Sequence, residues 1–360
     1  MKVLSVVGAR PNFMKLAPLA RSLSKRGGVK HVIVHTGQHY DVEMSASFFC
    51  DLGIPEPDVN LEVGSGSHAQ QTAQIMGRIE TVLLEQRPDV ILVYGDVNST
   101  VAAALVASKL GVKVGHVEAG LRSRDWSMPE EINRVVTDRL ANLLFTPSRD
   151  GNDNLRAEGV PNGRIHFVGN IMIDSVTYVL PKARQLNTSE RYALTDREYV
   201  VVTLHRPSNV DSADTLGELL RALEQIGNDY PVLFPVHPRT KQRMAQFALE
   251  PPENSGVRLL EPIGYLEMLS LVDRAGLVIT DSGGLQEETS FLGVPCLTAR
   301  PNTERPVTIA LGTNELVPSQ CGPIVEAARK RFGAVREGAV IELWDGHAAE
   351  RIADILERSV

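Results

Sequence analysis

Short apolar runs rich in β-branched residues alternate along the chain with segments whose apolar residues recur at a helical period. The runs predict strands near residues 2–7, 31–36, 90–94, 112–117, 143–146, 165–168, 199–204, 232–236, 257–260, 277–280 and 294–298. The segments between them predict helices that include 12–26, 68–86, 99–109, 129–141, 213–227, 265–274 and 284–292. This alternation is typical of parallel sheets whose strands are joined by crossover helices.

The alternation occurs twice and is interrupted by the polar, charged segment 175–197. With 360 residues, the chain exceeds the roughly 250–300 residues at which a single hydrophobic core stops growing. We therefore predict an α/β protein with two Rossmann-like, doubly wound parallel-sheet domains, over residues 1–175 and 185–344, that face each other across a cleft. The amphipathic segment 345–360 is predicted to form a helix that packs back on the first domain.

The charge balance excludes one broad class of protein. The chain has 37 Lys and Arg residues against 44 Asp and Glu residues, a formal net charge of −7. A general nucleic-acid-binding protein is disfavoured, because its affinity depends on neutralising phosphates. Residues 1–40 nevertheless contain seven basic and no acidic side chains, so this part of the chain could attract a small anion.

Cysteine usage and hydropathy exclude further classes. The three cysteines are far apart and form no CxxC pair, so neither a disulfide framework nor a zinc site is predicted. No long apolar stretch predicts a membrane span, and the first apolar run is too short for a signal peptide. We expect a cytoplasmic protein with no membrane partner.

The strongest local motif is LVITDSGGLQEE, in which a strand leads through Ser282, Gly283 and Gly284 into a helix. Glycine lacks a β-carbon, so backbone N–H groups can approach an anion, and the helix N-terminus adds partial positive charge. The motif predicts a phosphate or diphosphate cradle, with Glu288 placed to accept ribose hydroxyls. The alternative is a tight turn in which Asp281 or Ser282 only caps the helix.

Two familiar cofactor motifs are missing. The first strand leads into Gly-Ala-Arg-Pro-Asn-Phe and not GxGxxG, and the second strand ends at His35 and Thr36 without an acidic residue for a ribose. GxxxxGK[ST] does not occur in the sequence either. Nicotinamide, flavin and P-loop ATP chemistry are therefore disfavoured.

Acidic residues follow two apolar strands of the first half. Asp96 comes after VYG and Glu118 after GHV, so both are expected at the same edge of one sheet. Glu130 and Glu131 open a predicted helix, where they could instead complement the helix dipole and pair with Arg134. Paired carboxylates at a cleft predict proton transfer, with one group removing and one returning a proton.

Histidines end two strands of the second half. His205 and His237 could serve the predicted site, although a histidine at a sheet edge can equally be a satisfied core group. A metal site is disfavoured, because there is no HxH or HExxH spacing and His116 lacks a third ligand near Glu118.

Several segments, in order over nearly the whole chain, resemble one enzyme family. They are GARPNFMKLAPL, VYGDVNSTVA, HVEAGLRS, MPEEINRVVTDRLANLLF, VGNIMIDS, VTLHRPSNV, PVHPRT and TDSGGLQEETSFLGVPCLTARPNTERP. Together they resemble the non-hydrolysing UDP-N-acetylglucosamine 2-epimerases. The resemblance implies a glycosyltransferase B-type fold, often as a homodimer, and an isomerase that interconverts UDP-N-acetylglucosamine and UDP-N-acetylmannosamine without metal or nicotinamide. Such an enzyme would supply precursors of cell-envelope polysaccharide.

The resemblance also assigns roles to residues. Positions that match the family's catalytic set are Lys15, Asp96, Glu118, Glu131 and His205. Positions that match its substrate-binding residues are Ser282, Gly283 and Gly284 at the diphosphate, Arg10 and Arg305 near the phosphates, Glu288 at the ribose, and Tyr265 and Met268 in the segment resembling the uracil pocket. The implied chemistry is anti elimination of UDP to a bound glycal, followed by re-addition with inversion at C2.

One segment departs from the family pattern, and three alternatives stay open. Many bacterial members have an allosteric substrate site near a GQHR-type segment, whereas this chain has Gly37-Gln38-His39-Tyr40-Asp41, which argues against allosteric activation. The alternatives are a hydrolysing 2-epimerase, a 2-epimerase of a related sugar such as a diacetamido-uronic acid, and a nucleotide-sugar-binding protein or glycosyltransferase that does not epimerise.

Overall fold

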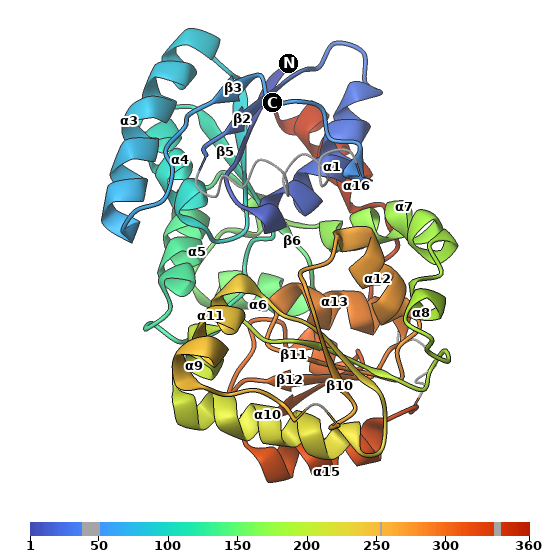
Figure 1. Ribbon diagram of the computed structural model, residues 1–360. Coiled ribbons are helices and arrows are strands. Elements are labelled where there is room, and N and C mark those ends of the chain that lie inside the picture. Colours follow the sequence, from blue (N-terminus) through green and yellow to red (C-terminus); the bar gives the residue numbers. More distant parts are fainter. Residues whose placement is uncertain (38–50, 253, 335–339) are drawn as a thin grey trace. The chain divides into compact units, whose positions relative to one another are not determined.

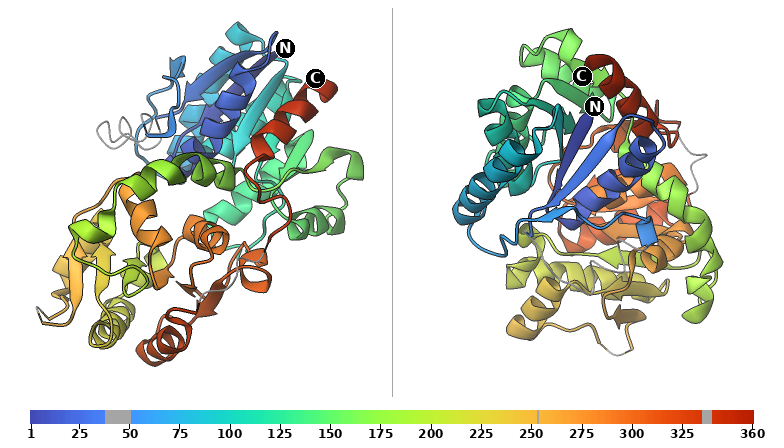
Figure 2. Two further views of the ribbon diagram at one scale, coloured as in Figure 1. Left: turned by 90° about the vertical axis from the view of Figure 1, so that its right-hand side faces the viewer. Right: turned by 90° about the horizontal axis from the view of Figure 1, so that it is seen from above.

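The computed structural model describes residues 1–37, 51–252, 254–334 and 340–360, apart from the side chain of Arg10 (Figure 1). The chain divides into two compact units. The first unit comprises Met1–Tyr178 and Glu342–Val360, and the second comprises Val179–Ile341. In each unit, helices cover both faces of one sheet (Figure 2).

The sheet of the first unit has the order β3-β2-β1-β4-β5-β6-β7, and all its strand pairs are parallel. Its strands are β1 (Lys2–Val7), β2 (Lys30–His35), β3 (Val59–Asn60), β4 (Val90–Tyr94), β5 (Lys113–Val117), β6 (Leu143–Thr146) and β7 (Ile165–Phe167). The order reverses between β1 and β4, so the sheet is doubly wound and its ligand site is expected at the carboxyl ends of these strands.

The helices of the first unit are α1 (Arg10–Ser24), α3 (His68–Gln86), α4 (Asn98–Lys109), α5 (Pro129–Leu140), α6 (Arg149–Ala157), the beginning of α7 (Ile171–Gln185) and α16 (Ala348–Ser359), with a 3₁₀ turn at Asn162–Arg164. Helix α16 packs against α1, and Arg26 after α1 forms ion pairs with Asp354 and Glu357. The buried side chains of α16 are those of Ala348, Ala349, Ile352, Ala353 and Leu356.

The sheet of the second unit has the order β10-β9-β8-β11-β12-β13 and is also entirely parallel. Its strands are β8 (Val200–Thr203), β9 (Val232–Pro235), β10 (Val257–Leu260), β11 (Leu277–Thr280), β12 (Cys296–Ala299) and β13 (Asn314–Val317). Its helices are the end of α7, α8 (Thr188–Arg191), α9 (Pro207–Val210), α10 (Ala213–Gly227), α11 (Pro238–Phe247), α12 (Tyr265–Asp273), α13 (Gly283–Leu292), α14 (Val307–Ala310) and α15 (Cys321–Arg331).

Both faces of the strands β8, β9 and β11 are buried, which explains why these strands are continuous, largely apolar runs in the sequence. Val200 and Val202 of β8 point into the cluster formed with α10 and α15, while Tyr199 and Val201 point into the cluster formed with α12 and α13. Successive side chains of a strand alternate between faces, so each needs to be apolar when both faces are covered. The predicted class of two doubly wound parallel-sheet units is confirmed.

The limits of the units differ by a few residues from the predicted ones. The first unit extends through Tyr178, because α7 begins at Ile171 within it and Ser175 donates a hydrogen bond to the Met14 carbonyl. The chain rejoins this unit at Glu342, because the buried Trp344 indole donates to the Pro147 carbonyl at 3.0 Å. Strand β13 was not predicted, because its sequence NELV mixes polar and apolar residues.

Candidate active site

The two strand-end acids of the first unit lie at one edge of its sheet. Asp96 follows β4 and Glu118 follows β5, and these two strands are parallel neighbours in register. Glu118 has φ +73°, and Gly95, which lies between β4 and Asp96, has φ +61°. A left-handed backbone is uncommon for a residue other than glycine, and such conformations cluster at functional sites.

A buried ion pair joins Glu118 to α1. The Lys15 ammonium contacts the Glu118 carboxylate, and the side chains of both residues are only 4% exposed. Gly95 makes this approach possible, since a β-carbon at residue 95 would lie 2.8 Å from Lys15 Nζ. The sequence predicts both residues as site residues but not their contact.

A second cluster of charges forms around Arg134 on α5. Its guanidinium pairs with Glu131 on the same helix and with Asp96 beyond β4. Glu131 is buried and also accepts hydrogen bonds from the amides of Ser123 and Arg124, at 2.9 and 2.8 Å. Burial raises the pKa of Glu131, but these amide hydrogen bonds and the Arg134 charge together hold it below its usual value.

The two adjacent acids at the start of α5 have different surroundings. Glu131 is 1% exposed and is held by several donors, whereas Glu130 is only half-buried. Complementing the helix dipole does not require burial, so dipole complementation alone does not explain the position of Glu131. The side chain of Arg10 and residues 38–41 of the GQHYD segment lie outside the described residues.

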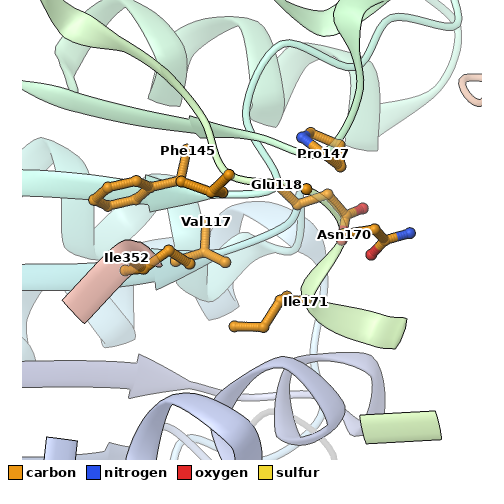
Figure 3. Close-up of a pocket in the computed structure, with 9 residues that line it drawn as sticks. Val117, Glu118, Phe145, Pro147, Asn170, Ile171 and Ile352 are labelled. Carbon is orange, nitrogen blue, oxygen red and sulfur yellow. The ribbon is translucent and has the colours of Figure 1, made fainter. Parts of the chain in front are cut away.

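Figure 3 shows a small hollow in the first unit beside Glu118. It is lined by Val117, Glu118, Phe145, Pro147, Val168, Gly169, Asn170, Ile171 and Ile352. Asn170 is 1% exposed, and its Nδ2 has no hydrogen-bond partner within the described part of the chain. The hollow therefore brings together a buried carboxylate and an unsatisfied amide donor.

In the second unit, His205 is oriented by Asp281. The fully buried Asp281 carboxylate lies 2.9 Å from His205 Nδ1 and accepts the backbone amides of His205 and Arg206, at 2.9 and 2.8 Å. Burial raises the pKa of Asp281, but the contacts with His205 and the amides lower it below its usual value. Asp281 engages His205 Nδ1, so Nε2 is the ring nitrogen left to exchange a proton with a ligand.

His205 and its neighbour His237 thus differ in surroundings. The His205 side chain is 40% exposed, and its ring lies 5.4 Å from the ring of His237. His237 is the N-cap of α11 and its Nδ1 accepts the Arg239 amide at 3.2 Å. Both histidines are predicted from the sequence, but the contact of Asp281 with His205 is not. The position of Asp281 directly after a strand was the available signal.

The Ser-Gly-Gly turn opens α13. Ser282 occupies the N-cap position without a side-chain capping hydrogen bond, and the Asp281 side chain accepts hydrogen bonds from His205, Arg206 and Asn209. Capping therefore does not account for this motif. A β-carbon at Gly283 would lie 2.6 Å from Arg305 Nη1, so the Arg305 guanidinium lies beside the helix N-terminus.

Two further predicted residues, Tyr265 and Glu288, meet between α12 and α13. Tyr265 donates a hydrogen bond from its hydroxyl to Glu288 at 3.1 Å, and both residues are buried. Met268 is half-buried one turn along α12 from Tyr265 and packs against the core. Arg305 forms ion pairs with Glu287 and Glu304, which hold its side chain in place.

Two observations concern sites of other kinds. Within the described ranges, no group of three or more His, Cys, Asp or Glu side chains is arranged to hold a metal ion. None of the helices in the described part of the chain has the length and apolar character of a membrane span.

Two Rossmann-like units with polar residues at the carboxyl ends of their strands are the architecture of the glycosyltransferase B-type fold. The model of the UDP-N-acetylglucosamine 2-epimerase family matches residues 21–357, and the chain belongs to this family.

Its relatives cover the chain almost completely. A UDP-N-acetylglucosamine 2-epimerase homolog of Methanococcus maripaludis is 43% identical, with 99% of both chains covered. The UDP-2,3-diacetamido-2,3-dideoxy-D-glucuronate 2-epimerase of Pseudomonas aeruginosa is 41% identical, over 99% of this chain and 100% of that protein. The crystal structure of Methanocaldococcus jannaschii UDP-GlcNAc 2-epimerase in complex with UDP-GlcNAc and UDP is similar with a TM-score of 0.92, at 40% identity and full coverage of both chains.

Proposed function

We propose that this protein interconverts UDP-N-acetylglucosamine and UDP-N-acetylmannosamine by anti elimination of UDP to a bound glycal and re-addition with inversion at C2. The observation that carries the proposal is the set of charged groups in the first unit. Glu118 is paired with Lys15, and Asp96 and Glu131 are paired through Arg134. The ion pairs hold these carboxylates in place, and carboxylates are among the side chains that remove and return protons in catalysis.

The chemistry explains why more than one acid/base group is needed. The proton on C2 is not activated by a carbonyl group, so its loss has to be coupled to the departure of UDP. Removal from one face and return to the other require two acid/base groups or one mobile group. Asp96, Glu118 and Glu131 are the candidates, and Lys15 can stabilise the charge of Glu118 as it changes protonation state.

We assign binding of the departing UDP to the second unit. Negative charge on the leaving diphosphate is stabilised by backbone amides at a helix N-terminus and by nearby cations. Ser282, Gly283 and Gly284 open α13, and Arg305 lies beside them. His205, oriented by Asp281, is the candidate to protonate or hydrogen-bond the leaving oxygen.

The remaining assignments concern the nucleoside and the phosphates. Glu288, joined to Tyr265, is proposed to accept the ribose hydroxyls, and Met268 to line the uracil pocket. Arg10 is proposed near the phosphates on the family resemblance.

A second candidate substrate is a UDP-diacetamido-uronic acid. The Pseudomonas aeruginosa relative named for that sugar is 41% identical to this chain, close to the 43% of the Methanococcus maripaludis relative. The elimination and re-addition would be the same for either sugar, because both react at C2 next to the UDP leaving group.

We also propose that the protein is a cytoplasmic homodimer that supplies precursors of cell-envelope polysaccharide. Apolar side chains on and next to α5 support the dimer: Trp126 is 65% exposed, Ile132 45% and Val136 38%. Ile132 and Val136 lie one helical turn apart, and exposed apolar side chains gathered in this way are typical of interfaces. Light scattering coupled to size-exclusion chromatography tests the dimer, and Ile132→Glu should yield monomers.

Running the reaction in heavy water tests the proposed activity. The epimerase incorporates solvent deuterium at sugar C2, and both epimers should appear with the label. A hydrolysing enzyme would instead release free N-acetylmannosamine and UDP. Unlabelled substrate after long incubation would rule out epimerisation, as expected for a binding protein. Repeating the assay with both UDP-sugars identifies the substrate.

A further inference from the structure

One buried imidazole joins the two strand ends that carry the candidate acid/base residues. His116 lies in β5, two residues before Glu118, and is fully buried. Its Nε2 lies 2.8 Å from the carbonyl oxygen of Gly95, the residue directly before Asp96. Its Nδ1 lies 2.6 Å from a carboxylate oxygen of Asp138 on α5.

Both partners of the ring are hydrogen-bond acceptors. A carbonyl oxygen has no proton to donate. The other oxygen of Asp138 contacts Arg122 at 2.7 Å and accepts the Gly120 amide at 3.1 Å. Burial raises the pKa of Asp138, but the contacts with His116 and Arg122 hold it below its usual value, so Asp138 is a carboxylate at neutral pH. The two contacts of His116 therefore both require an N–H group on the ring, and the ring that makes them is doubly protonated.

Paired charges around Asp138 compensate for burying this cation. Arg122 contacts Asp138 at 2.7 Å and makes two hydrogen bonds to Glu158, at 2.7 and 2.8 Å. The group thus contains two cations and two carboxylates, and the amide of Gly120 also donates to Asp138 at 3.1 Å. Buried charges are tolerated when they are paired and hydrogen-bonded in this way.

The position of Asp138 on α5 explains what this group can do. Glu131, Arg134 and Asp138 follow one another at helical spacing, and each makes contacts toward the sheet edge. Arg134 holds the Asp96 side chain directly, whereas Asp138 holds the preceding peptide through His116. Asn133 adds a hydrogen bond from Nδ2 to the Asp96 carbonyl at 2.9 Å.

We propose that His116 is a positioning residue for the acid/base groups: its doubly protonated ring clamps the Gly95 carbonyl to Asp138 and so fixes Asp96 relative to Glu118. The proposal rests on the epimerase function proposed above. The peptide after Gly95 sets the direction of the Asp96 side chain, and small misplacements of a reacting group can reduce a rate about 100-fold. The ring needs no contact with substrate to have this effect.

Two substitutions separate the contacts of the ring. The amide nitrogen of Asn can replace Nδ1, so His116→Asn keeps a donor toward Asp138 and loses the donor toward Gly95. The amide nitrogen of Gln can replace Nε2, so His116→Gln keeps the donor toward Gly95. We expect kcat to fall about 100-fold in His116→Asn and 10-fold or less in His116→Gln. KM for the UDP-sugar and Kd for UDP should stay within about twofold in both variants.

His31→Gln is the matched control, because His31 lies near the amino end of β2 in the same sheet and bonds to Ser5 at 2.8 Å. It should leave kcat unchanged. Equal loss of kcat in the two His116 variants, loss confined to KM, or the same loss in His31→Gln would overturn the proposal.

A spectroscopic measurement tests the clamp without any activity. In wild-type protein labelled with ¹⁵N-histidine, the fully buried ring of His116 should show two slowly exchanging N–H signals at neutral pH. The loss of these signals in the His116 variants assigns them to this ring. If those variants do not fold, couplings that connect the ring to the backbone of His116 assign the signals instead. A single N–H on this ring would overturn the proposal. If wild-type protein epimerises no UDP-sugar, the proposed function fails and this measurement still decides whether the clamp exists.

Discussion

Lys15 of α1 and Glu118 after β5 form an ion pair whose two side chains are each only 4% exposed. The pair connects a helix that follows the first strand to an acid at the end of a strand far along the chain. Burial makes the pair sensitive to the loss of one partner, because the remaining charge would be left without compensation. Substituting one partner or both partners can therefore separate the effect of the ion pair on stability from its effect on turnover.

Removing Lys15 alone should destabilise the fold more than removing both charges. We expect Lys15→Met to lower the free energy of unfolding by about 3 kcal/mol or more, and the double variant Lys15→Met with Glu118→Gln to recover most of that loss. Turnover should be lost in both variants, by about 100-fold or more. Urea unfolding and the heavy-water assay measure the two effects. Turnover that returns with stability in the double variant would make the pair structural.

The adjacent acids at the start of α5 provide a matched comparison. Glu131→Gln should lower kcat about 100-fold, because it removes the charge that binds Arg134 and the amides of Ser123 and Arg124. Glu130→Gln, one residue away and half-buried, should leave kcat within about twofold. Isothermal titration with UDP should give similar Kd values for both variants. Similar kcat values in the two variants would argue against a role for Glu131.

A methyl group at Gly283 should disturb the proposed diphosphate site. Because the added β-carbon would lie 2.6 Å from Arg305 Nη1, the guanidinium has to move away from the N-terminus of α13. We expect Gly283→Ala to raise Kd for UDP about tenfold, which is about 1.4 kcal/mol. Gly322→Ala is the control, since a β-carbon there meets no atom within 4 Å. UDP affinity that is unchanged in Gly283→Ala would move the diphosphate site elsewhere.

Asp174 on α7 should give the first unit a distinct pH dependence. Burial raises the pKa of Asp174 to about 6, although the amides of Ala348 and Ala349 at the start of α16 donate to it and oppose the rise. The folded protein therefore binds this proton more tightly than the unfolded chain, whose Asp pKa is about 3.9. The contribution of Asp174 to the stability of the protein is greatest below about pH 4 and falls as pH rises to about 6.

Comparison with Asp174→Asn isolates this effect. The stability of wild type relative to the variant should fall by about 2 kcal/mol between pH 4.5 and pH 7.5. Urea unfolding at the two pH values measures the difference, and Asp153→Asn on the exposed face of α6 should show no such change. If the stability of wild type increases relative to that of Asp174→Asn as pH rises, the assigned direction of the pKa is wrong.

The sequence by itself determined the two parallel sheets and the residues at their edges. Runs such as VILVY and LVIT are apolar throughout because both faces of these sheets are covered by helices. In parallel neighbours in register, the residues that follow two strands lie at the same edge, so Asp96 and Glu118 could be placed together from their positions after β4 and β5.

Only the tertiary structure decided which groups these residues meet. Lys15 reaches Glu118, Arg134 reaches Asp96, Asp281 orients His205, and His116 bridges Gly95 and Asp138. Each contact joins segments that are distant in the chain or face one another only across an edge of a sheet. Strand order and the placement of helices bring such segments together, and those depend on packing of the whole unit and not on the periodicity of any one segment.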